Sequence, residues 1–124
     1  MLSKLKQALD GTGITFSHFG WTRMANSTTG DFGVYAETGA KDFIANDKHL
    51  EHGLIVSVDL FTHNDSSTPK DTIEAAFATV PNLVYSLVSI GYDEDTGYIH
   101  YNWEVGLYGK ETSGLSSVGS QGTV

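Results

Sequence analysis

Cysteine is absent from the 124-residue sequence, so disulfide bonds and thiolate-ligated metal sites are excluded. Long apolar runs are absent too, since no stretch approaches the roughly 18 residues that a membrane-spanning helix needs. The first residues, MLSKLKQALDG, lack the long apolar centre of a signal peptide. These absences predict a cytoplasmic protein with no membrane segment.

Basic residues are scarce. Seven Lys and Arg stand against fifteen Asp and Glu, which gives a formal net charge of −8. Lys4 and Lys6 are the only closely spaced pair, whereas a protein that binds phosphate backbones normally carries a basic patch. The charge therefore disfavours direct nucleic-acid binding, but it suits a surface past which DNA moves without sticking.

Signatures of common enzyme sites are missing. The sequence has no G-x-S-x-G nucleophile elbow, no phosphate-binding G-x-x-x-x-G-K loop, no H-E-x-x-H zinc motif and no G-x-G-x-x-G after a strand. We therefore expect no catalytic residues and no cofactor.

Two imidazoles lie close enough in sequence to be tested as a zinc site. His49 and His52 could share a metal ion on a helix, but a third ligand would have to come from elsewhere. The preferred interpretation is that this segment is exposed to solvent and leads into the following strand.

The acidic segment near residue 94 partly matches a calcium-binding EF-hand loop. Asp93, Asp95 and Glu104 occupy its first, third and twelfth places. However, Gly97 replaces an oxygen ligand at the fifth place, and Tyr98 stands at the sixth, where glycine is required. An exposed acidic hairpin is the preferred interpretation.

Residues 54–80 contain the strongest structural signal. Apolar residues at every second position predict a strand, because they alternate with residues of the opposite face; they are Leu54, Val56, Val58 and Leu60. The polar turn HNDSS follows, and TPKD then begins a helix, with Thr68 as the expected cap. Apolar residues at helical spacing continue to residue 80, and a proline at position 81 ends the helix. A strand covered by its own helix predicts a core.

The other elements follow from similar patterns. A short helix is expected over residues 2–10, and strands are expected in residues 14–24, 32–37, 83–92 and 98–105. The order α-β-β-β-α-β-β, with short links, predicts an α+β domain: a mostly antiparallel sheet with helices packed on one side. This domain spans residues 1–108, and the Gly- and Ser-rich residues 109–124 are expected to form a flexible tail.

Aromatic residues could form a stacking platform for single-stranded nucleic acid, but the negative charge disfavours it. Trp103 lies on the apolar face of its strand, so a core role is preferred. For Trp21 and Phe19, core packing and subunit contact both stay open.

Five segments follow one another along the chain: a short helix, a DFGVYAE strand, the GLIVSVDLFTHND strand, the helix TPKDTIEAAF and the hairpin SIGYDEDTGYIHYNWEVGLYG. This order resembles that of the tail-terminator or tail-completion proteins of long-tailed bacteriophages. The resemblance covers most of residues 1–108 and rests on fold patterns, not on catalytic signatures. It implies a virion protein of the tail, assembled in the host cytoplasm, with no catalytic residues.

The resemblance also implies partners. Such proteins form a ring, commonly a hexamer, at the head-proximal end of the tail, where they stop growth of the tail tube and provide a docking surface for the head connector. DNA would pass through the ring without specific binding.

Two predicted loops, residues 25–31 and 38–47, are candidates for contacts within such a ring because long loops in small domains are often functional. The candidate interface residues in and near them are Trp21, Asn26, Thr29, Asp31, Asp42, Phe43 and Asp47. Acidic residues would repel phosphates in the channel, and the candidates are Asp93, Glu94 and Asp95, together with Asp42 and Asp47.

Two other functions stay open. One is a neighbouring neck role, as a head-completion or adaptor subunit or its equivalent in a tail-derived particle. The more remote one is a small metal-binding or hydrolytic α+β domain that uses His49, His52 and acidic residues.

Overall fold

A computed structural model describes residues 2–19, 30–45 and 49–110. Within these ranges the chain forms, in order, α1 (Leu2–Asp10), β1 (Thr15–His18), β2 (Phe32–Ala45), β3 (His49–Thr62), α3 (Thr68–Phe77), β4 (Leu83–Tyr92) and β5 (Ile99–Lys110). The predicted α+β class and the order α-β-β-β-α-β-β are confirmed.

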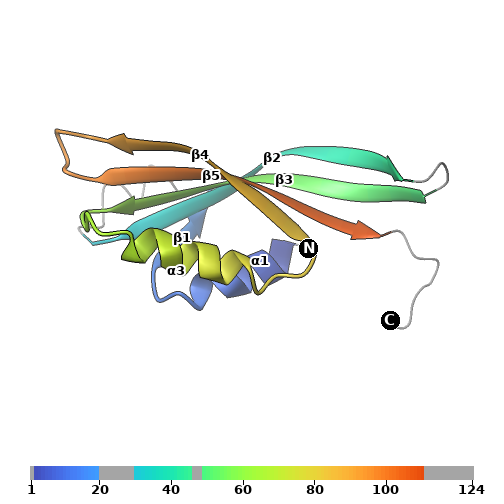
Figure 1. The fold of residues 1–124 in the computed structure, drawn as a ribbon, viewed down its shortest axis with the longest axis horizontal. Helices are drawn as coiled ribbons and strands as arrows, with labels where there is room; N and C mark the ends of the chain where they lie inside the picture. Colours follow the sequence, from blue (N-terminus) through green and yellow to red (C-terminus); the bar gives the residue numbers. More distant parts are fainter. Residues whose placement is uncertain (1, 20–29, 46–48, 111–124) are drawn as a thin grey trace.

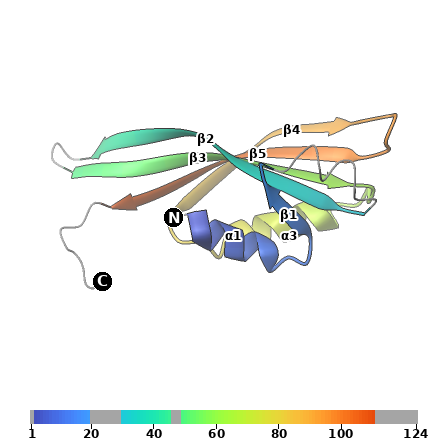
Figure 2. The ribbon, with the colours of Figure 1, turned by 180° about the vertical axis from the view of Figure 1, so that it is seen from behind.

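The five strands form one sheet in the order β1-β2-β3-β5-β4. All neighbouring strands are antiparallel except the short β1, which runs parallel to β2. Both helices pack against the same face of the sheet (Figures 1 and 2). The opposite face carries no helix in the described part of the chain.

Alternation along β3 and β5 creates the core. Their buried, helix-facing side chains are opposed in register, with Val58 beside Trp103 and Val56 beside Val105. The helices cover this face with four fully or almost fully buried side chains: Leu5, Leu9, Ile73 and Phe77. Both the strand alternation and the helical spacing read from the sequence therefore identified core residues.

The polar turn before α3 ends in a proline-containing first helical turn, as expected. The N-cap is Ser67 and not Thr68, which is already helical and is followed by Pro69. The regular helix ends at Phe77, three residues earlier than predicted, and the chain continues in turns in which the Val80 amide donates to the carbonyl of Phe77. Val80 is nevertheless buried, because its side chain still reaches the core.

Trp103 is the largest fully buried side chain, and its polar edge has a partner. The indole Nε1 donates to Glu74 Oε2 at 3.0 Å, while Lys70 Nζ donates to Glu74 Oε1 at 3.1 Å. A buried indole N–H without an acceptor would be costly. One carboxylate of α3 therefore joins the helix to the centre of the sheet.

The predicted loop over residues 38–47 is wrong for residues 38–45, and its last two residues lie outside the described part of the chain. β2 continues to Ala45 and pairs with the start of β3. Thr38 and Gly39 looked like a break in the strand pattern, but the sheet absorbs them by a register shift between Glu37 and Gly39. This part of β2 and β3, with the end of β5, extends beyond the two helices (Figure 1).

The second hairpin matches its expected turn chemistry. Gly97 has φ +77°, the left-handed region that glycine adopts at no steric cost, and its amide donates to the carbonyl of Asp93 at 2.7 Å. The final strand is longer than expected and reaches Lys110. The rest of the predicted tail, residues 111–124, lies outside the described residues.

β1 is held against β2 at a glycine. Phe16 is the register partner of Gly33, and a Cβ added there would lie 2.1 Å from Phe16 Cε2. The aromatic ring therefore occupies the space that any other side chain at position 33 would need.

We predict that Glu74→Ala lowers the free energy of unfolding by about 1–3 kcal/mol, because the buried Trp103 N–H loses its acceptor. Glu74→Gln keeps an acceptor oxygen and should lose less. Denaturant titration followed by circular dichroism measures both, with Glu94→Ala in the exposed hairpin as the control. Equal stability of Glu74→Ala and the control would contradict this role.

We predict that Gly33→Ala costs about 1–3 kcal/mol, because the Phe16 ring must leave its position on β2. Gly39→Ala is the matched control on the same strand, because a Cβ there has no neighbour within 4 Å and the backbone does not require glycine. Thermal unfolding of the two variants gives the comparison. A Gly33→Ala protein as stable as Gly39→Ala would refute the close packing.

Candidate functional site

The predicted interface residues are only partly within the described chain. Asp31 directly precedes β2, and Asp42 and Phe43 are residues of β2 instead of loop residues. The other four, Trp21, Asn26, Thr29 and Asp47, lie outside the described residues.

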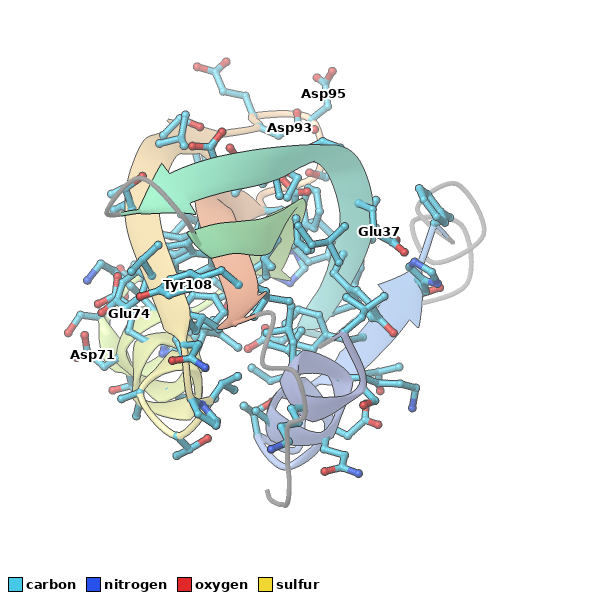
Figure 3. All side chains as sticks on the ribbon, turned by 90° about the vertical axis from the view of Figure 1, so that its right-hand side faces the viewer. Glu37, Asp71, Glu74, Asp93, Asp95 and Tyr108 are labelled. Atoms are coloured by element: carbon cyan, nitrogen blue, oxygen red, sulfur yellow. The ribbon has the colours of Figure 1, made fainter. Side chains whose placement is uncertain are left out.

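The predicted acidic residues divide between two ends of the sheet. Asp93, Glu94 and Asp95 are exposed in the β4–β5 hairpin, next to the start of β5. Figure 3 shows Asp93 and Asp95 on the side of the molecule away from the helices, with Asp95 projecting outwards. Asp42 pairs with His52, close to the other end of β5, and Asp47 is not described. Within one copy, Asp42 therefore does not join the hairpin acids in one patch.

Neither of the two segments that were tested as metal sites in the sequence takes the geometry that its motif requires. His49 and His52 are on strand β3 instead of a helix. Asp93 Oδ1 accepts the amide of Asp95 at 3.0 Å within a β-hairpin, so the acidic segment is not a helix–loop–helix unit. Among the described residues, no group of three or more His, Asp or Glu is placed to hold a metal ion.

Three of the aromatic residues considered for nucleic-acid stacking are buried. Trp103 is fully buried, and Tyr35 and Tyr101 are 4% and 6% exposed, so the faces of these three rings are not available to bases. Among residues 2–19, 30–45 and 49–110, no helix is long and apolar enough to cross a membrane.

An aromatic hollow lies on the sheet face opposite the helices. It encloses about 450 Å³, and its lining residues are Phe32, Val34, Asp59, Phe61, Asp93, Thr96, Tyr98 and His100. The rings form a connected cluster, because Phe61 stacks on Phe32 and on His100 with centroid separations of 4.8 and 4.2 Å. The hollow adjoins the acidic hairpin, which supplies three of its lining residues.

Polar contacts fix one wall of this hollow. His100 Nε2 lies 2.6 Å from Asp59 Oδ1, and Asn102 Nδ2 donates to the same oxygen at 2.9 Å. The Asn102 amide also donates to Ser57 Oγ at 3.0 Å. The partners of His100 and Asn102 on β3 depend on strand order. These contacts join β3 and β5 across the sheet and give the carboxylate a structural role.

The second distinctive surface is strand β4 at the edge of the sheet. Its exposed large side chains are Val84, Tyr85, Val88, Ile90 and Tyr92, each between 41% and 66% exposed. The strand contains no charged residue and no proline. Isolated exposed apolar residues are common, but five of them on one edge strand are typical of an interaction site. The sequence signal was the uncharged run LVYSLVSIGY, which we interpreted only as a strand.

The other edge of the sheet carries an ion pair. His18 on β1 binds Glu37 on β2 through Nε2 and Oε1. This hydrogen bond holds the pKa of the Glu37 carboxyl below its ordinary value of 4.5, assisted by a hydrogen bond from the residue's own backbone. Figure 3 shows Glu37 beside the end of β1.

Comparison of the sequence with models of known protein families and with curated proteins finds no match. The surfaces themselves therefore carry the functional argument.

The lowered pKa of Glu37 predicts a pH dependence of stability. The pair stabilises the fold above the ordinary carboxyl pKa, and this contribution disappears as the pH falls through the lowered folded-state pKa. Glu37→Gln should therefore be less stable than the wild type at pH 7, and the difference should shrink in acid. Denaturation midpoints measured from pH 7 down to about pH 3, a range that includes the usual carboxyl pKa values, test this, with Glu94→Gln as control. A constant difference across that range would contradict the assignment.

Proposed function

We propose that this chain is a structural subunit of a bacteriophage tail. In this role, copies of the chain form a ring at the head-proximal end of the tail tube, where the ring ends tube growth and supplies the surface to which the head is joined. The observation that carries the proposal is the open, uncharged β4 edge with its exposed apolar side chains.

An open apolar edge favours assembly for a physical reason. The outer backbone groups of an edge strand can pair with another chain, and most monomeric proteins protect such strands with charge, proline or a covering element. β4 has neither charge nor proline. A subunit whose task is to join neighbours has a use for such an edge, whereas a monomeric protein would be exposed to aggregation.

The shape of the sheet also supports this role. The outer parts of β2 and β3, together with the end of β5, project beyond the helices as an arm of the sheet (Figure 2). An arm of this kind extends the reach of a subunit towards a neighbour or towards the tube.

The acidic hairpin is compatible with a DNA channel. Asp93, Glu94 and Asp95 are exposed together at one end of the sheet. If this end faces the channel, the carboxylates repel the DNA phosphates, and the net charge of −8 acts in the same direction.

The proposal predicts a ring. Light scattering and negative-stain imaging of the purified protein, alone and mixed with the tube protein of the same virus, should show closed rings, and the mixture should contain tubes capped at one end and limited in length. A protein that stays monomeric under all these conditions, and that leaves tube growth unchanged, would overturn the proposal.

A further inference from the structure

We propose that the ring is built by strand addition, in which β4 of one copy pairs with the free outer edge of β2 in the next copy. This inference rests on the proposed function, because it names the contact that would hold the ring together. It would make the sheets of successive subunits one continuous structure.

The first edge is β4. In the described part of the chain, β4 pairs only with β5, so its outer backbone groups have no strand partner. Its ten residues are LVYSLVSIGY, without any charge that would oppose the approach of another copy. For a protein of net charge −8, an uncharged strand is the surface at which two copies repel each other least.

Two apolar side chains of β4 lie on the core face of the sheet but are exposed, so they are suited to burial against another chain. Ile90 and Tyr92 are register partners of Tyr101 and Ile99, so they lie on the same face as the hydrophobic core. They are nevertheless 58% and 66% exposed, because the helices do not extend over this part of the edge. A strand added beyond β4 would bring side chains alongside Ile90 and Tyr92 and extend the core across the boundary.

A register shift between Leu87 and Ser89 adds a further apolar residue to this edge. The shift leaves Val88 without a partner opposite it on β5, and its side chain is 61% exposed. Bulges are one of the ways in which edges are twisted away from pairing. In β4 the shift instead leaves one more large apolar group for a neighbour to cover.

The second edge is on the other side of the same sheet. β2 has 14 residues, of which four pair with β1, so ten lack a strand on their outer side within the described chain. This equals the ten residues of β4. The two edges are thus matched in length, and every copy carries both.

The positions of the two edges favour a second copy as the partner and a ring as the product. A contact between different surfaces of identical subunits repeats from copy to copy, and it closes into a ring when the rotation between copies allows it. Pairing of β4 with β4 would be self-complementary and would end at a dimer. Only the β4–β2 contact leaves a new β4 edge and a new β2 edge available after each addition.

Charge substitutions on β4 test the surface. Val88→Lys and Ile90→Lys place a charge at exposed positions, so the fold should be kept while the ring-sized species is lost. Ser66→Lys, in the exposed turn before α3, adds the same charge away from the edge and should leave the rings unchanged. Circular dichroism and denaturation midpoints confirm that each variant is folded.

The outcomes separate this inference from the proposed function. If the wild type forms rings and the folded Val88→Lys and Ile90→Lys proteins form them too, the β4 contact is overturned and the ring function stays intact. Absence of rings in the wild type, with and without tube protein, would overturn the function itself.

Cross-linking tests the pairing mode, and the absence of native cysteine makes it specific. Ser89→Cys marks β4 and Thr38→Cys marks the free edge of β2, both at exposed positions. With a short bifunctional maleimide, covalent dimers should form when the two single variants are mixed, and a ladder of oligomers should form in the double variant. Dimers of Ser89→Cys alone, or rings without cross-links in the mixture, would overturn the β4–β2 contact.

Discussion

Burial of one sheet face beneath two short helices is the constraint on which the rest of the structure depends. α1 and α3 have nine and ten residues, and such short helices are stable only when they are docked. Their apolar stripes and the helix-facing residues of β3 and β5 therefore fold as one unit. Glu74 determines the position of α3 in this contact, because the buried Trp103 N–H binds at this single position on the helix.

The limited size of this cover explains the location of the surfaces that we consider functional. Two helices cover the central strands, but they leave the arm of β2 and β3 and the outer part of β4 without cover. The opposite face is stabilised differently, by stacked rings and by the contacts of Asp59 with His100 and Asn102. The chain thus uses its small core for the centre and leaves the edges available for contacts.

The local elements could be predicted from sequence because their signals are local. Alternation from Leu54 to Leu60 and the proline-containing start of α3 each depend on a few neighbouring residues, and both predictions were confirmed. The continuation of β2 was missed because a register shift at Gly39 interrupts its alternation. The aromatic hollow and the open edge could not be predicted, because both depend on strand order, which pairs residues distant in sequence.

The strand order also determines when the assembly edge comes into existence. β5, the last element of the described chain, lies between β3 and β4, so β4 has no neighbour in the described sheet until β5 has been synthesised and inserted. The pairing of β3 with β5 joins segments that are far apart in sequence, and such pairings form slowly. An incomplete chain therefore cannot present β4 in its final geometry. Under the proposed mode of assembly, incorporation into a ring would itself require a complete fold, and truncated or misfolded copies would be excluded.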